Sequence, residues 1–265
     1  MPTDVTYSSY LDLDLDRLLQ AQHPVSGAHD EMLFIVVHQA SELWLKLCLH
    51  ELNAARDQII EGDLRAAFKM LARVARAQEQ LIQSWDVLST MTPHDYSTVR
   101  PHLGRSSGFQ SGQYRMMEFV LGGRNLDMVK IHESSPKIAN ELRGEASRPS
   151  LYDTAIRLLS NSGFQIDDQV LERNLTDPYV HNSSVESAWA EIYRNPQSHW
   201  DIYELAEKLV DLEYHFQRWR FGHLKTVERI IGFKRGTGGT KGVPYLAGVL
   251  EQAFFPELLS VRTAM

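Results

Sequence analysis

A histidine lies within an apolar helical pattern in the last fifth of this chain of 265 residues. His223 shares one helix face with apolar residues spaced three and four apart, because such steps return to the same side of a helix. These residues are Ile202, Leu205, Leu209, Leu212, Phe216, Trp219, Val227 and Ile230. An imidazole on such a face either forms a hydrogen bond within the core or binds a metal. The pattern alone leaves both interpretations open.

A glycine-rich loop follows this helix. Gly236, Gly238 and Gly239 leave room for backbone N–H groups to come close to a bound group. The loop is not a phosphate-binding P-loop, because Lys241 is followed by Gly242 instead of Ser or Thr and a helix precedes it. The loop therefore indicates a ligand site of another kind next to His223.

His38 is the second candidate for chemistry. It lies one helical turn after Phe34 and has apolar neighbours, so both side chains share a helix face. A neutral imidazole there could accept a hydrogen bond from a ligand. A hydrogen bond to a neighbouring helix is an equally good interpretation of the periodicity.

Arg100 is the third candidate, and Tyr96 and Ser107 flank it. Its planar guanidinium matches the geometry of a carboxylate. Because Pro101 follows, we expect an extended backbone at Arg100. A second interpretation is an arginine in a loop that only contacts solvent.

Two tyrosines near the N-terminus, Tyr7 and Tyr10, are the fourth feature. Terminal segments fray unless they are held by contacts. These rings are therefore either docked on another surface or left as unused apolar area. The economical interpretation is that they cover a pocket, including one in a neighbouring subunit.

Helices, which the spacing of apolar residues predicts, must position all these residues. Asp30 and Asp63 are expected to cap two helices that run to Ile59 and Leu88, and the short turn between them predicts an antiparallel pair. The last long helix is expected over residues 199–231. Further helices are predicted near residues 110–121, 149–160, 185–193 and 245–254, with a loop over 91–107 and short helices with loops over 125–148. Strand signals are nearly absent. The sequence predicts an all-α single domain over residues 1–265.

Composition excludes several classes of function. The net charge of -7 comes from mixed acidic and basic residues without a basic block, so nucleic-acid binding has little support. The single cysteine, Cys48, excludes an intrachain disulfide and any multi-cysteine metal site, and indicates a reducing compartment. No apolar run reaches the roughly 18 residues of a membrane span, and the N-terminus lacks a signal-peptide pattern. We expect a cytoplasmic protein without a membrane or nucleic-acid partner.

Four motifs in order along the chain carry a resemblance to a known family. They are Tyr7–Leu11, His29–Trp44, Ser106–Ser111, and Trp219–His223 with the glycine-rich Gly232–Gly239. Together they resemble tryptophan 2,3-dioxygenases, and the resemblance covers nearly the whole chain. It implies an all-α, haem-binding helical bundle that is an obligate oligomer, usually a homotetramer built as a dimer of dimers. It further implies oxidation of L-tryptophan by O2 to N-formyl-L-kynurenine, the entry to tryptophan catabolism by the kynurenine pathway.

The resemblance also implies roles for individual residues around haem b, which is active in its ferrous form. His223 corresponds to the proximal ligand of the haem iron. His38 corresponds to the distal histidine that meets the indole N–H. Ser107 and Trp85 fall where the family has haem-pocket residues.

The implied substrate contacts involve four further residues. Phe34 lines the substrate pocket, and Arg100 pairs with the substrate carboxylate with help from Tyr96. Thr237 contacts the substrate ammonium together with a haem propionate.

The N-terminal motif corresponds to a segment that acts in another subunit. Tyr7, Tyr10 and Leu11 match residues that complete the pocket of an adjacent subunit in the family. Residues 1–22 are therefore expected to reach a neighbouring subunit.

Three positions depart from the family pattern. Ser8 replaces a usual glycine, Gly112 a common leucine, and Gly222 a larger polar residue. We expect the two glycines to enlarge the pocket, since they remove side-chain volume near the haem-bearing helices. A substituted tryptophan, and a monooxygenation of it to an oxindole, therefore remain possible for this chain. The sequence is also compatible with a haem sensor or carrier without turnover, and with a helical scaffold in which His223 is only packed.

Overall fold

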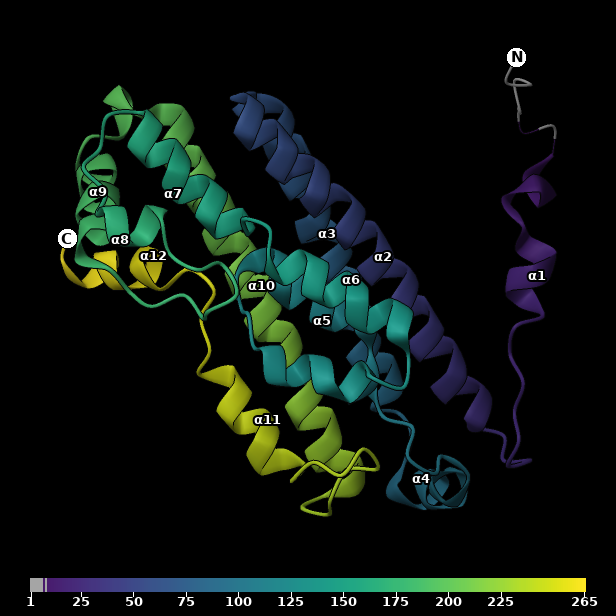
Figure 1. The fold of residues 1–265 in the computed structure, drawn as a ribbon. Coiled ribbons are helices and arrows are strands. Elements are labelled where there is room, and N and C mark those ends of the chain that lie inside the picture. Colours follow the sequence, from purple (N-terminus) through teal and green to yellow (C-terminus); the bar gives the residue numbers. More distant parts are fainter. Residues whose placement is uncertain (1–6, 8) are drawn as a thin grey trace.

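The computed structural model describes residue 7 and residues 9–265, and all regular elements in this part of the chain are helices (Figure 1). No strand occurs among the described residues. The all-α prediction is therefore confirmed. Short 3₁₀ turns at Tyr10–Leu13, Arg100–His102, Gly108–Gln110, Leu126–His132, Pro196–Ser198 and Val261–Thr263 connect or extend the α-helices.

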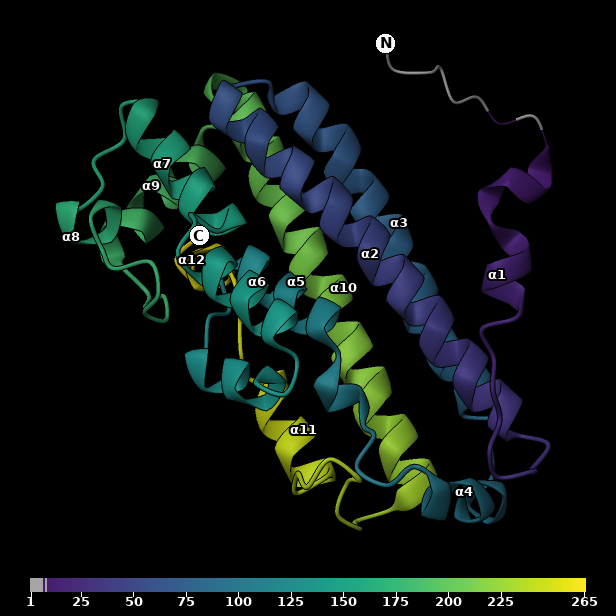
Figure 2. The same ribbon diagram turned by 45° about the vertical axis from the view of Figure 1, so that its right-hand side comes forward.

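Three long helices form the body of the molecule. α2 (Glu31–Glu61), α3 (Leu64–Leu88) and α10 (Trp200–Ile231) lie along one another in both views of Figures 1 and 2. Gly62 ends α2 with a φ of 82°, a left-handed conformation that favours glycine, and the Asp63 carboxylate caps α3. The predicted antiparallel pair is confirmed.

The apolar stripe of α10 faces this bundle as its spacing predicts. Its buried members pack against α2 and α3 in one continuous core. They include Leu205, Leu209, Leu212 and Phe216 from α10, Cys48, Leu52 and Ala55 from α2, and Leu71, Val74 and Leu81 from α3. Helices that each present an apolar face bury those faces in a shared core, and this arrangement fixes where His223 lies.

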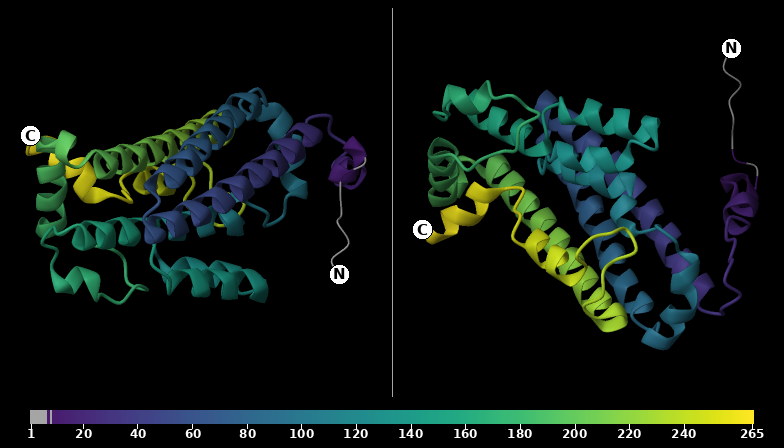
Figure 3. Two further views of the ribbon diagram at one scale, coloured as in Figure 1. Left: turned by 90° about the horizontal axis from the view of Figure 1, so that it is seen from above. Right: turned by 60° about the horizontal axis from the view of Figure 1, so that its bottom comes forward.

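Shorter helices cover one side of the bundle. α5 (Gly112–Leu121), α6 (Pro136–Ala146) and α7 (Leu151–Asn161) form a second layer in the view from above (Figure 3), and α9 (Ser183–Arg194) packs on α10 at one end of it. The remaining short helices are α8 (Asp168–Leu171), α11 (Val243–Leu250) and α12 (Pro256–Ser260). α11 packs on α10 and follows the glycine-rich loop, so the loop is held at both ends.

A helix occupies part of the segment for which the sequence predicts a loop. α4 spans Pro93–Val99 and begins with a capping box, in which Thr92 and Asp95 bond to each other's backbone N–H groups. Pro93 suits the first helical position because that residue needs no N–H donor. The loop prediction is wrong here because proline is typical of helix starts as well as of loops.

The backbone of Arg100 also differs from the prediction. Its φ and ψ of -51° and -42° are helical, not extended. The chain continues from α4 into a 3₁₀ turn, in which Leu103 donates to the carbonyl of Arg100. Pro101 fits that turn because the hydrogen bond joins Leu103 to Arg100 and needs no N–H group from Pro101. The usual preference for an extended backbone before proline is therefore overridden.

The N-terminal segment stands apart from the bundle. α1 (Leu15–Leu19) has no buried residue, and Figures 1 and 3 show it separated from α2. α2 is long and apolar enough to cross a membrane by length and composition alone. It nevertheless packs on α3, α5 and α7, which is the environment of a helix within a folded bundle.

Candidate active site

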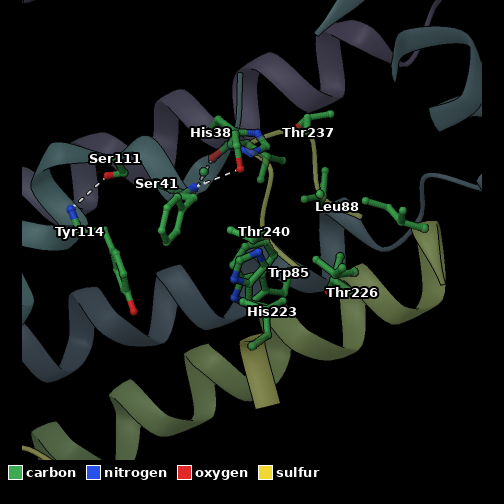
Figure 4. Close-up of a pocket in the computed structure, with 18 of the residues that line it drawn as sticks. His38, Ser41, Trp85, Leu88, Ser111, Tyr114, His223, Thr226, Thr237 and Thr240 are labelled. Carbon is green, nitrogen blue, oxygen red and sulfur yellow. Dashed lines mark hydrogen bonds between the residues drawn. The ribbon is translucent and has the colours of Figure 1, made fainter. Parts of the chain in front are cut away.

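A cavity opens between α2, α3, α10 and the loop that follows α10 (Figure 4). Its volume is about 210 Å³, whereas one water molecule needs roughly 10–15 Å³. The cavity is therefore a site for a large ligand. Seven residues singled out from the sequence line it, namely Phe34, His38, Trp85, Tyr96, Ser107, His223 and Thr237.

His223 projects into this cavity from α10 without a hydrogen bond. Its ring stacks on the Trp85 indole, with 4.7 Å between centroids and an interplanar angle of 4°, and Trp219 flanks it at 5.9 Å. Residue 7 and residues 9–265 offer neither ring nitrogen a hydrogen-bond partner. Burial, and next the charge of His38, lower its pKa from 6.5 to about 4. The imidazole is thus neutral at neutral pH, with a lone pair available to a metal.

His38 lies across the cavity on α2 (Figure 4). Its Nδ1 is 2.7 Å from the carbonyl oxygen of Phe34, one helical turn earlier. A carbonyl only accepts, so Nδ1 carries the proton and the neutral ring keeps Nε2 as an acceptor. Burial lowers the pKa of His38 and favours this neutral form. The centroid of the Phe34 ring lies 4.1 Å from that of the imidazole, and this contact further restricts the orientation of the imidazole.

The buried neutral imidazole predicts acid sensitivity of the ligand-free protein. In the unfolded chain His223 gains a proton near pH 6.5, but in the folded protein only near pH 4. Between these values the unfolded state binds more protons, so the free energy of unfolding falls as the pH drops. The loss reaches about 3 kcal/mol at pH 4 and is absent above pH 6.5.

Urea unfolding of the ligand-free protein at pH 7 and pH 5 measures this effect. The His223→Gln variant should show a weaker pH dependence than the wild type. The His50→Gln variant is the control, because His50 is exposed on α2 and lies outside the cavity. An unchanged pH dependence in His223→Gln would show that this ring is not buried in its neutral form.

Arg100 lies beside the cavity and is not part of its lining. One terminal nitrogen donates to the carbonyl of Arg235 at 2.7 Å, and the other is buried without a partner. The guanidinium also lies over the Tyr96 ring, 5.9 Å from its centroid. Tyr96, which the guanidinium overlies, lines the cavity, so Arg100 lies next to the cavity wall.

The glycine-rich loop packs on the segment around Ser107. The Thr237 hydroxyl donates to the carbonyl of Ser106 at 2.6 Å, which leaves its oxygen free to accept. A Cβ on Gly238 would lie 2.8 Å from the Ser107 Cβ, so only glycine permits this approach. Ser107 in turn caps the turn Gly108–Gln110. Gly238 thus allows the loop to pack closely on Ser107.

Two buried arginines line the cavity that were not identified from the sequence. Arg115 and Arg220 both pair with the carboxylate of Glu118. The Nε atoms of both arginines are buried without an acceptor. Because two guanidinium groups share one carboxylate, some of their N–H donors remain available for an anionic group of a ligand. Arg115 and Glu118 are spaced like a surface ion pair, so nothing in the sequence marked them as buried.

The expectation that two glycines enlarge the cavity is wrong. A Cβ on Gly222 would lie 2.7 Å from Cδ1 of Trp85, and a Cβ on Gly112 would lie 2.8 Å from Cγ2 of Ile138. Neighbouring side chains already fill both spaces. Gly222 allows an aromatic ring to approach, and Gly112 allows α5 to pack on α6.

The N-terminal candidates do not reach this cavity within the same chain. Tyr7 and Tyr10 are 75% and 76% exposed and are absent from its lining. Residues 1–6 and 8, and the side chain of Leu11, lie outside the described part of the chain.

Comparison with known proteins extends this picture over the whole chain. The family model described as tryptophan 2,3-dioxygenase matches residues 2–146 and 190–265. The tryptophan 2,3-dioxygenase of Erythrobacter litoralis is 79% identical over 265 residues, which is all of both chains. That of Cupriavidus necator is 55% identical over 98% of this chain and 88% of the relative. Tryptophan 2,3-dioxygenase 1 of Ralstonia nicotianae is 56% identical over 98% and 87%. The motifs, the paired histidines of the cavity and these matches together establish that the chain belongs to the tryptophan 2,3-dioxygenase family.

Proposed function

We propose that this chain is a haem-dependent enzyme that oxidises L-tryptophan with O2 to N-formyl-L-kynurenine by cleaving the indole C2–C3 bond. The main support for the proposal is that two neutral histidines face each other across one large apolar cavity. His223 has a free lone pair and no partner, and His38 offers an acceptor nitrogen. Figure 4 shows the two rings on opposing sides of the space between them.

The residues of the cavity fit haem b. Among the described residues, no cluster of three or more metal-binding side chains is found. A metal carried by a porphyrin needs only one protein ligand, which His223 supplies. The unpaired Nε–H of Arg115 suits a propionate, and the Trp85 indole supplies an apolar wall beside His223. When bound, ferrous haem supplies the iron that binds O2.

The remaining residues suit a zwitterionic amino acid with an indole ring. Arg100 offers unpaired N–H groups to the carboxylate, and the Thr237 oxygen accepts from the ammonium. The Nε2 atom of His38 accepts from the indole N–H, and Phe34 contacts the ring. His38 acts as a hydrogen-bond acceptor and not as an obligatory base, because the indole N–H is very weakly acidic. Holding the substrate at both ends makes positioning a major source of the rate gain.

Monooxygenation and haem transport receive less support from the site. Monooxygenation of a substituted tryptophan requires a pocket enlarged at Gly222 and Gly112, and those spaces are filled. The relatives compared above are named as dioxygenases. A haem carrier would need neither an unpaired guanidinium at the cavity edge nor an acceptor histidine opposite His223. The site therefore favours turnover of tryptophan.

We also infer a homotetramer, built as a dimer of dimers, in the cytoplasm. The outer face of α2 carries apolar side chains that the described residues leave partly exposed, namely Met32, Val36, Leu43 and Leu47. The N-terminal segment leaves Tyr7, Tyr10 and Leu19 exposed. Residues 1–22 would bury this area by covering the cavity of a neighbouring subunit. The buried free thiol of Cys48 suits a reducing compartment.

Deletion of residues 1–11 should reduce turnover of L-tryptophan by about tenfold or more while the haem spectrum stays close to that of the wild type. The reason is that the tyrosines would close the substrate side of a neighbouring cavity and not the side of His223. Steady-state kinetics and absorption spectra of the deleted protein check this. Full activity of the deleted protein would contradict the role of the segment as a lid between subunits.

An oxygen electrode tests the proposed function directly. Reduced, haem-loaded protein should consume O2 when L-tryptophan is added and should not do so with the same concentration of L-phenylalanine. A haem spectrum without tryptophan-dependent O2 consumption would identify a carrier or sensor instead.

A further inference from the structure

No protein group among the described residues orients the ring of His223 through a hydrogen bond. A metal-binding histidine ordinarily donates its second N–H to a carboxylate, a carbonyl or a water molecule, which fixes the ring plane. The described residues provide no hydrogen-bond partner to either nitrogen of His223. The imidazole instead stacks on the Trp85 indole, with 4.7 Å between the ring centroids and an interplanar angle of 4°. The contacts that orient this ring are therefore packing contacts.

The Trp85 indole is held in place by packing as well. Its Nε1 is buried without a hydrogen-bond partner, so no polar contact within the described chain fixes its rotation. One edge of the ring fits against the backbone of α10 at Gly222. A Cβ there would lie 2.7 Å from Cδ1 and 3.3 Å from Cγ of the indole. The absence of a side chain at Gly222 is thus what admits the indole to this position.

We propose that Gly222 and Trp85 act together as a positioning device for His223. Gly222 admits the indole against α10, and the indole sets the rotation of the imidazole plane about its Cβ–Cγ bond. The residue directly before the proposed iron ligand thereby controls the orientation of that ligand. This inference rests on the proposed function, since it treats His223 as the residue that would hold the haem iron.

Any side chain at position 222 should disturb this arrangement in a defined way. The Cβ overlaps the rigid five-membered ring of the indole and not the end of a flexible chain, so Trp85 must move as a body. Because the imidazole packs face to face with that ring, its plane must rotate or lose its support. The expected consequence is a changed iron–histidine bond, with the fold retained.

The test compares Gly222→Ala with a matched control, Gly144→Ala. Gly144 lies inside α6, and a Cβ there would meet nothing within 4 Å. Both variants add one methyl group to a helix, and only one of them faces Trp85. The readouts are the iron–histidine stretching band of the ferrous protein in resonance Raman spectra and the rate of haem transfer to an excess of apomyoglobin.

We expect Gly222→Ala to shift or broaden the iron–histidine band and to lose haem about tenfold faster, as is typical when the support of a metal ligand is removed. Gly144→Ala should match the wild type in both readouts. In a Trp85→Leu background, the Gly222→Ala change should have no further effect, because the overlapping ring is gone. A purely structural role of Gly222 would instead give additive effects in the double variant.

The outcomes separate this inference from the proposed function. If the wild-type protein shows no axial histidine band with haem, the proposed function fails, and the inference fails with it. If the wild type binds haem through His223 and Gly222→Ala keeps the wild-type band and haem-loss rate, only the inference is overturned. Should Gly222→Ala not fold, Trp85→Leu alone decides. Its iron–histidine band must then broaden, and an unchanged sharp band would overturn the inference.

Discussion

The His223→Ala variant is expected to lose stable haem binding altogether. In the described part of the chain, His223 is the cavity histidine with no hydrogen-bond partner on either ring nitrogen, whereas His38 across the cavity is bonded to the Phe34 carbonyl. The fall in haem affinity should exceed about 100-fold, the upper range for loss of a group that only supports a ligand. Reconstitution of the purified protein with haem, followed by the Soret absorption, measures it.

Two further variants make this result specific. His223→Gly leaves a space into which free imidazole can enter, so millimolar imidazole should restore the Soret band. His215→Ala removes a histidine from the same helix outside the cavity and should bind haem as the wild type does. If His223→Ala retains full haem occupancy, another residue ligates the iron and the assignment of His223 is wrong.

The Arg100→Ala variant is expected to raise the KM for L-tryptophan by about 10- to 100-fold. A hydrogen bond to a charged group contributes roughly 1.5–3 kcal/mol, and every 1.4 kcal/mol corresponds to a factor of ten. The unpaired terminal nitrogen of Arg100 is the donor that would supply this interaction. Arg100→Lys keeps the charge but loses the planar pair of donors, so its KM should lie between those of Arg100→Ala and the wild type.

A change of substrate separates recognition of the carboxylate from general damage to the site. Tryptamine lacks the carboxylate, so its weak binding should be the same in Arg100→Ala and the wild type. Arg105→Ala is the matched protein control, since Arg105 is exposed and lies just after the turn that holds Arg100. An unchanged KM for L-tryptophan in Arg100→Ala would remove this arginine from the substrate site.

Much of the fold follows from local patterns in the sequence. The apolar stripe of α10 and the expected starts at Asp30 and Asp63 predict the three long helices close to their observed bounds, although only the Asp63 carboxylate accepts a capping hydrogen bond and that of Asp30 does not. The pattern does not reveal α4, because its signal is a short capping box around Pro93 and proline is also typical of loops. The predicted backbone of Arg100 is wrong because a tertiary turn overrides a local preference.

Some residues of the site can also be identified from local sequence patterns, whereas other features of the site depend on tertiary packing. His223 and His38 can be identified because a histidine on an apolar face is unusual, and the structure brings both to one cavity. The tautomer of His38 depends on the Phe34 carbonyl, which only coordinates can show. Burial of Arg115 depends on neighbours distant in sequence. The expectation for Gly222 fails because a sequence shows where volume is missing and not which side chain fills it.

Aerobic turnover of L-tryptophan in heavy-isotope O2, followed by the mass of the product, tests the central claim most directly. Reduced, haem-loaded protein should give N-formyl-L-kynurenine, in which the indole ring is open and both added oxygen atoms carry the label. A product that gains a single oxygen atom with the ring intact, or no product from tryptophan, would contradict the account.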